Sequence, residues 1–217
     1  MESIYALLLG YALGSVPFGL ILTRAFGAGD IRTIGSGSIG ATNVLRTGRK
    51  ELAAATLLLD AGKGFAAVWL ASLIWADGDN PLLSWLLAGL GALVGHCFPM
   101  WLRFEGGKGV ATMLGISFAL DWRIGLASAL VWLVATFLTR ISSVGGMSSA
   151  IASPIAAFAL SFFAFKTGDI AISPLGGIVL FAQGIVLLLL AALVIFQHRA
   201  NIARLRAGTE PKIGQKA

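Results

Sequence analysis

Seven apolar stretches alternate with short polar segments along this chain of 217 residues. A helix rises 1.5 Å per residue, so about 20 apolar residues are needed to cross the roughly 30 Å hydrocarbon core of a bilayer. The stretches are residues 4–23, 52–76, 82–102, 110–120, 124–139, 150–165 and 174–196. The pattern predicts an all-α integral membrane protein with about seven transmembrane helices.

Two of these stretches depart from a simple membrane span. The first contains Gly14-Ser15-Val16-Pro17-Phe18-Gly19, and a proline between glycines predicts a kink that neighbouring helices support. Residues 110–120 would rise only about 17 Å as a helix, so they cannot cross the hydrocarbon core unaided. A short helix inside the bundle is compatible with this length, and the sequence leaves open whether residues 110–120 fully cross the bilayer.

Composition supports a membrane protein with a single domain over residues 1–217. The chain is 57% hydrophobic and 12% charged, whereas soluble domains carry about 25% charged residues. Its mean hydropathy is +0.87. Glu2 replaces the basic start of a secretory signal, so we interpret the first stretch as a retained span.

The positive charge of the chain is unevenly distributed between the two sides of the predicted bundle. With the N-terminus outside and the C-terminus in the cytoplasm, Arg123 and Lys166 lie outside and Lys63 lies within a span. The other 13 of the 16 Lys and Arg residues are then cytoplasmic, as the positive-inside rule requires. This topology explains the net charge of +6, and we expect no nucleic-acid partner.

Asp60 and Lys63 are three residues apart within the second stretch. Side chains at this spacing share one face of a helix, and charges within a membrane are normally paired. The spacing predicts an intramembrane ion pair.

Three glycine-rich segments, near residues 30–50, 103–109 and 140–149, all fall on the predicted cytoplasmic side. Glycine permits positive φ and leaves backbone N–H groups open to anions, and Arg or Lys adds phosphate-binding charge. The first contains Gly35-x-Gly37-x-x-Gly40, but the membrane spans around it exclude a Rossmann fold. The pairs Gly62-Lys63 and Gly107-Lys108 lack the earlier glycine of a phosphate-binding P-loop. What remains is a general capacity to bind phosphate groups.

The remaining reactive side chains offer few candidates. His96, at the end of a span, is interpreted as an interfacial residue, and Cys97, the only cysteine, as a small packed side chain. His198 and Asn201 can share a helix face, which leaves a functional and a structural role equally open. His, Cys and carboxylate residues lack metal-ligand spacing, so neither a metal nor another cofactor is expected.

The segment Gly35-Ser-Gly-Ser-Ile-Gly-Ala-Thr-Asn-Val-Leu-Arg46 resembles the first signature of the bacterial acyl-phosphate:glycerol-3-phosphate acyltransferase family (PlsY). Gly95-His-Cys-Phe-Pro99 with Phe104-Glu-Gly-Gly-Lys-Gly-Val-Ala-Thr112 is similar to the second signature. Ser142-Ser-Val-Gly-Gly146 and His198-Arg-Ala-Asn-Ile202 are similar to the third signature and the His-x-x-Asn tail. The resemblance covers nearly the whole chain.

The resemblance implies acyl transfer from acyl phosphate to the sn-1 hydroxyl of glycerol 3-phosphate, which gives lysophosphatidic acid and phosphate. It implies a multi-pass protein of the bacterial cell inner membrane, surrounded by lipid, and leaves open whether a soluble acyl-phosphate-producing enzyme is a partner. The implied catalytic residues are Ser36, Arg46, Lys108, His198 and Asn201. The implied substrate-binding residues are Gly35, Gly37, Ser38, Gly40, Thr42, Asn43, Gly106, Gly107, Gly109, Ser142, Ser143 and Gly145.

The sequence leaves open how the proton is transferred and whether the protein is an enzyme or a transporter. The proton of the attacking hydroxyl passes either to a substrate phosphate or to His198 acting as general base. The alternative function is transport of a phosphorylated metabolite, because broken spans and anion-binding loops also suit a transporter. A transporter should show internal repeats and a site at the bilayer midplane, whereas the polar motifs here cluster at one membrane face.

Overall fold

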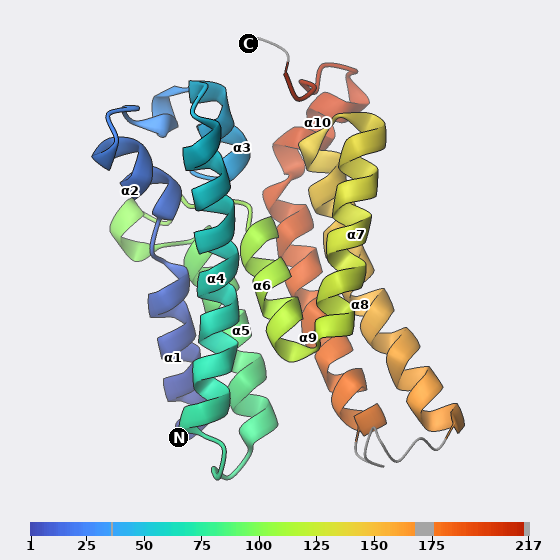
Figure 1. Cartoon of the computed structure of the whole chain (residues 1–217). Helices are drawn as coiled ribbons and strands as arrows, with labels where there is room; N and C mark the ends of the chain where they lie inside the picture. Colours follow the sequence, from blue (N-terminus) through green and yellow to red (C-terminus); the bar gives the residue numbers. More distant parts are fainter. Residues whose placement is uncertain (36, 168–175, 215–217) are drawn as a thin grey trace.

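The computed structural model describes residues 1–35, 37–167 and 176–214, and the regular elements in these ranges are helical (Figure 1). The α-helices are α1 (Glu2–Gly14), α2 (Phe18–Ala25), α3 (Ala41–Val44), α4 (Lys50–Ile74), α5 (Pro81–Cys97), α6 (Val110–Leu120), α7 (Trp122–Thr139), α8 (Ser142–Thr167), α9 (Gly176–Gln197) and α10 (Arg199–Arg206). Short 3-10 turns occupy Ile31–Thr33, Leu45–Thr47 and Met100–Leu102.

Six segments of the described chain are long and apolar enough to cross a membrane. They are Glu2–Ala25, Lys50–Ile74, Pro81–Leu102, Trp122–Thr139, Ser142–Thr167 and Gly176–Gln197. Helix α6 has only 11 residues and lies between the two halves of the bundle (Figure 1). The short helix is confirmed, whereas seven crossings and the orientation of the termini stay predictions.

Helix α6 joins two groups of helices. Helices α1, α4 and α5 pack against one another, as α8 does with α7 and α9, and α6 contacts helices of both groups. Gly115 brings α6 very close to α4, because a Cβ at this position would overlap the carbonyl oxygen of Ala61. The cavity described below opens beside the start of α6.

The predicted break in the first span lies between α1 and α2, at Ser15–Pro17. A helix that stops leaves its last carbonyl groups without partners inside the helix. Here the indole Nε1 of Trp101 donates to the carbonyl of Ser15 at 2.9 Å, and Lys63 Nζ donates to the carbonyl of Val16 at 2.8 Å. Side chains from two other segments therefore satisfy the broken helix, as the sequence predicted.

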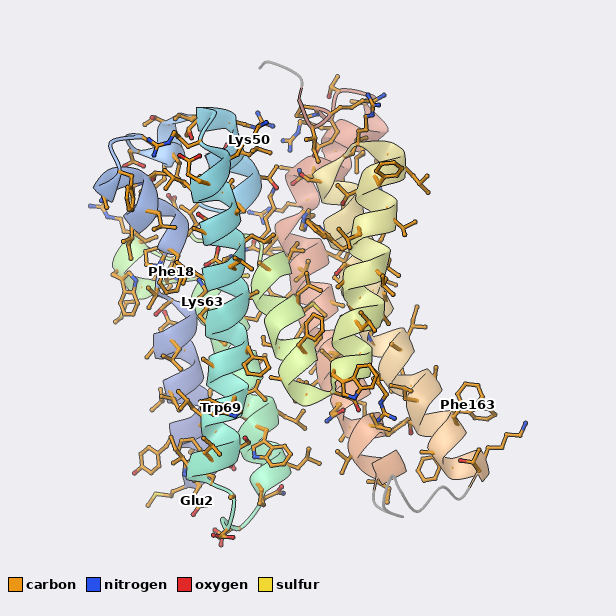
Figure 2. All side chains as sticks on the ribbon, in the orientation of Figure 1. Glu2, Phe18, Lys50, Lys63, Trp69 and Phe163 are labelled. Atoms are coloured by element: carbon orange, nitrogen blue, oxygen red, sulfur yellow. The ribbon has the colours of Figure 1, made fainter. Side chains whose placement is uncertain are left out.

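The outer surface of the bundle suits a lipid environment. Trp69 on α4 and Phe163 on α8 extend from the bundle (Figure 2), and each exposes half or more of its surface. By contrast, Cys97 is buried in the apolar core, which confirms its interpretation as a packing residue.

The third glycine-rich segment is not a turn, which corrects the prediction for residues 140–149. Arg140 and Ile141 form the connection, and α8 begins at Ser142. Gly145 serves helix packing, because a Cβ there would overlap the hydroxyl of Thr136 on α7. Ser142 and Ser143 are thus placed by a helix start rather than by a flexible loop.

Candidate active site

A cavity of about 820 Å³ lies at the end of the bundle that carries α3 and α10. The loop before α3, the first half of α4, the start of α6 and the start of α8 contribute to its lining. Residues Glu210–Gly214 also line it, and the N–H of Ile213 donates to the carbonyl of Arg140 at 2.7 Å. The tail after α10 is thereby fixed as one wall.

The lining is strongly cationic. It includes five Lys and Arg side chains, Arg46, Lys50, Lys108, Arg204 and Lys212, and two acidic ones, Asp60 and Glu210, among the described residues. One of these acids, Glu210, is paired with Arg204 at 2.7 Å. Positive charge in a partly enclosed site attracts phosphate, so the cavity is suited to anionic ligands.

Arg46 is held beside the first glycine-rich loop. Gly35 has φ of +53° and lies so close to Arg46 that a Cβ would meet the arginine side chain at 2.7 Å. The amide of Asn43 fixes the loop by donating to the carbonyls of Ile31 and Ile34 at 2.7 and 3.0 Å. In the described chain Arg46 forms no ion pair, so its guanidinium can donate hydrogen bonds to a phosphate.

The second glycine-rich turn is built differently from the prediction of open N–H groups. The N–H of Gly106 donates to the carbonyl of Cys97 at 3.1 Å, and that of Gly107 donates to the carbonyl of His96 at 3.0 Å. A Cβ at Gly107 would overlap the imidazole of His96. These glycines allow close packing on α5, and what the turn presents to the cavity is Lys108 followed by the start of α6.

Lys108 is electrostatically tuned by this placement. Burial, together with the nearby charges of Arg204 and Arg46, lowers the pKa of Lys108 to about 8. The ammonium is charged at neutral pH, and its partial desolvation strengthens its attraction for a phosphate.

Glu210 connects three polar side chains of this wall. One of its oxygens accepts from Ser143 Oγ and from Asn201 Nδ2, both at 2.6 Å, and the other accepts from Arg204 Nε at 2.7 Å. Although burial raises the pKa of Glu210, these hydrogen bonds hold it below its ordinary value. The carboxylate is therefore ionised and fixes the orientation of its neighbours.

His198 and Asn201 both present acceptor atoms. His198 Nδ1 lies 2.7 Å from the carbonyl of Val194, which requires the proton on Nδ1 and leaves Nε2 as an acceptor. Asn201 gives its NH₂ group to Glu210, so its Oδ1, which has no hydrogen-bond partner among the described residues, remains an acceptor. Acceptors recognise hydroxyl groups rather than phosphate oxygens.

Burial lowers the pKa of His198 to about 4, because desolvation and the charge of Lys108 outweigh the hydrogen bond to Val194. The ring is 2% exposed. His198 is accordingly neutral across the physiological range and is a weak base.

Most predicted site residues come together around the cavity. Those that line it are Gly35, Ser38, Gly40, Thr42, Asn43, Arg46, Lys108, Gly109, Ser142, Ser143, His198 and Asn201. Gly37, Gly106, Gly107 and Gly145 do not line it, and Ser36 lies outside the described residues. Motifs that are distant in the sequence thus line one cavity, whereas several of their glycines lie outside its lining.

Sequence reasoning missed other parts of the site. His96 is 4% exposed and lines the cavity, so its interpretation as an interfacial residue is wrong. In the tail, the sequence drew attention to positive charge, His198 and Asn201 but not to Glu210, which is the single acidic residue from His198 onward. That isolated carboxylate was the available signal. No sequence pattern indicated that Trp132 of α7 also lines the cavity.

Comparison with known proteins shows which family this chain is similar to. Residues 4–208 match the protein family described as "Glycerol-3-phosphate acyltransferase". A glycerol-3-phosphate acyltransferase of Erythrobacter litoralis is 53% identical, over 97% of this chain and 95% of that protein. A protein of the same name from Roseobacter denitrificans is 51% identical, over 96% of this chain and 92% of its own length.

Two solved structures have a similar overall fold. The crystal structure of PlsY, described as an integral membrane glycerol 3-phosphate acyltransferase in the glycerol 3-phosphate form, is similar with a TM-score of 0.79 and 31% identity. The similarity covers 99% of this chain and 96% of that one. Its lysophosphatidic acid form gives a TM-score of 0.77 and 30% identity, with the same coverage.

Proposed function

This chain belongs to the glycerol-3-phosphate acyltransferase family, and we propose that it transfers a fatty acyl group from acyl phosphate to the sn-1 hydroxyl of glycerol 3-phosphate. The products are lysophosphatidic acid and inorganic phosphate. The observation that carries the proposal is that one cavity combines Arg46 and Lys108, which form no ion pair among the described residues, with hydroxyl-accepting atoms and apolar side chains at one end of a membrane bundle.

Glycerol 3-phosphate fits the wall formed by Lys108, His198 and Asn201. Of the two proposed substrates, it alone carries hydroxyl groups, which suit the acceptor atoms His198 Nε2 and Asn201 Oδ1. Lys108 is close enough to influence the pKa of His198, so it can hold the phosphate of the same molecule. In this assignment Lys108 acts as a hydrogen-bond donor, whereas His198 Nε2 and Asn201 Oδ1 act as acceptors.

Acyl phosphate fits the opposite wall. Arg46 and the loop from Gly35 to Gly40 would hold its phosphate, since a planar guanidinium matches phosphate geometry. Leu57 of α4, Val110 and Ala111 of α6 and Trp132 of α7 provide apolar lining for the chain. The acyl carbon would then lie between the two phosphate-binding groups.

Proton transfer in this reaction can be balanced by the substrates themselves. The hydroxyl oxygen forms a bond to the acyl carbon, the bond from that carbon to the phosphate oxygen breaks, and the hydroxyl proton passes to a phosphate oxygen. His198, with its pKa lowered to about 4, is poorly matched to remove a proton at neutral pH. We therefore infer that the enzyme acts mainly through positioning and charge stabilisation.

The predicted membrane topology fits this chemistry. We propose that the chain is a multi-pass protein of the bacterial inner membrane, with the N-terminus outside and the cavity and C-terminus facing the cytoplasm. Both substrates then reach the site from the side where water-soluble phosphate esters are available, and a soluble enzyme can supply the acyl phosphate.

The experiment that tests this function uses purified protein in lipid or detergent. Palmitoyl phosphate and radiolabelled glycerol 3-phosphate are supplied, with palmitoyl-CoA as an alternative donor, and label is followed into lysophosphatidic acid. Arg46→Ala should lose at least about a hundredfold in kcat/KM, since it removes a charge-assisted phosphate contact. Arg206→Ala is the matched control, because Arg206 is exposed and does not line the cavity.

Product from acyl phosphate but not from the thioester, lost in Arg46→Ala alone, is the expected result. Product from neither donor would reject the acyltransferase. Uptake of glycerol 3-phosphate into liposomes would then test the transporter.

A further inference from the structure

Three charged or titratable side chains form a buried cluster that the proposed reaction does not use. Asp60 Oδ1 lies 2.7 Å from Lys63 Nζ, which confirms the predicted ion pair, and 3.8 Å from His96 Nδ1. Each side chain of the three is 4% exposed. Lys63 also contacts the carbonyl of Val16 and lies 5.7 Å from the ring of Phe18 (Figure 2). The cluster joins the broken first span, α4 and α5.

Stability alone does not account for a charged pair at this depth. Taking two charges out of water is costly, and a buried pair can often be replaced by uncharged residues without loss of stability. Ionisable residues within membrane spans are in general associated with function. The contacts of His96 indicate what this function is.

His96 supports the turn that carries Lys108. Its carbonyl accepts from the N–H of Gly107, and its imidazole packs against the same glycine so closely that no Cβ would fit. Gln197 Nε2 holds the other side of the turn by donating to the carbonyl of Gly107 at 3.3 Å. The orientation of the His96 ring therefore affects the backbone position of Gly107 and, through it, the position of Lys108.

We propose that Asp60, Lys63 and His96 form a positioning cluster that holds the Gly106–Gly107 turn and so places Lys108 for the phosphate of glycerol 3-phosphate. Lys63 fixes Asp60, Asp60 faces His96, and His96 supports Gly107. The three residues act through this turn rather than on the reacting atoms. The inference rests on the proposed function, because it assigns Lys108 to that substrate.

The placement of Lys108 matters because its ammonium binds a phosphate oxygen well only at a charge-assisted hydrogen-bond distance of about 2.7–2.9 Å. Lys108 is a single flexible cation whose position depends on its backbone. If this turn becomes less ordered, KM for glycerol 3-phosphate should rise more than kcat falls. Binding of acyl phosphate at Arg46 should remain.

The first test is the double variant Asp60→Asn/Lys63→Met, which removes both charges together. We expect a melting temperature within about 4 °C of the wild type, the change that about 1 kcal/mol produces in a domain of this size. KM for glycerol 3-phosphate should rise at least about tenfold, with kcat within threefold and KM for acyl phosphate within twofold. A matched control is Asp121→Asn/Arg123→Met, which removes an ion pair of 2.6 Å at the α6–α7 junction and should leave both KM values unchanged.

The second variant, His96→Ala, leaves the ion pair in place and removes the ring beneath Gly107. It should show the same selective rise in KM, and it decides the matter if the double variant fails to fold. Folded variants with both KM values within twofold of the wild type, or with a lower kcat alone, would overturn the proposal.

The design separates the two proposals. Wild-type protein that makes no lysophosphatidic acid rejects the proposed function. Active wild type with kinetically unchanged variants rejects only the positioning cluster. Calorimetric titration with glycerol 3-phosphate, without acyl phosphate and in the same detergent, tests the cluster without turnover: both variants should bind glycerol 3-phosphate at least about tenfold more weakly than the wild type, and equal affinities would count against it.

Discussion

Glu210 determines how two other residues of the cavity can be used. Because it accepts the NH₂ group of Asn201, only the amide oxygen of Asn201 remains for a ligand. Because it pairs with Arg204, that cation is partly neutralised, whereas Lys108 and Arg46 remain for phosphate. At the scale of single residues, hydrogen bonds and ion pairs within the protein therefore determine which atoms remain for a ligand.

Lys108 should give the activity a limit at alkaline pH. With its pKa lowered to about 8 by burial, the side chain carries its charge below that pH and loses it above. We expect kcat/KM for glycerol 3-phosphate to fall about tenfold per unit above pH 8, since this parameter reports the free enzyme. Lys108→Arg should move this limit to higher pH, because the guanidinium stays charged. An unchanged alkaline limit in the arginine variant would assign it to another group.

His198 should contribute binding rather than proton transfer. We expect His198→Ala to lower kcat by roughly tenfold or less, and to raise KM for glycerol 3-phosphate through loss of one hydroxyl contact. The measurement is steady-state kinetics with both substrates varied. A loss of a hundredfold or more in kcat, with acyl phosphate binding intact, would instead identify His198 as the general base.

Helix α6 shows how element length creates the site. Its 11 residues rise only about 17 Å, and it lies between the two groups of helices (Figure 1). The space above its first turn is lined by Lys108, Gly109 and Val110. A full-length helix in this position would occupy that space.

The close contact between α6 and α4 should be sensitive to the smallest added side chain. Gly115→Ala would press a methyl group onto the carbonyl of Ala61, and overpacking of this kind costs about 1–3 kcal/mol. Gly62→Ala on α4 is the matched control, since a Cβ there meets nothing within 4 Å, and it should be neutral or stabilising by up to about 1 kcal/mol. Thermal unfolding of both variants in one detergent checks this. Equal melting temperatures would contradict the close packing.

The whole molecule combines a lipid-facing bundle with a polar cavity at one end. Three parts of the chain gather at this end, namely Lys50 at the start of α4, the first turn of α8 and residues Glu210–Gly214 after α10 (Figures 1 and 2). The α4–α5 connection, which carries Asp79, lies at the other end beside the N-terminus (Figure 1). Because all these segments belong to one bundle, a measurement at one end also tells which side of the membrane the other end faces.

The orientation can be measured with single cysteines, because Cys97 is fully buried and gives little background. A membrane-impermeant maleimide should label Asp79→Cys in spheroplasts. Arg206→Cys should react only after the membrane is permeabilised, since the positive-inside rule places the basic end in the cytoplasm. The opposite labelling pattern would invert the topology and place the cavity outside the cell.

The sequence by itself determined the parts of this protein that depend on local pattern. Apolar segment length indicated the membrane helices and the short helix at 110–120, Pro17 indicated the broken span, and the i, i+3 spacing of Asp60 and Lys63 indicated their pair. Four ordered motifs indicated the family and most cavity residues. These features follow from neighbours in the chain, because length, helix breaks and helix faces are local properties.

Only the tertiary structure decided how the motifs divide their tasks. The N–H groups of Gly106 and Gly107 are used by α5, residues 142–149 are helical, and His96 is buried beneath Gly107. Glu210 orients Asn201 from nine residues away, and Trp132 reaches the cavity from α7. Hydrogen-bond saturation, burial and pKa depend on which segments meet in space, and helix packing settles those contacts.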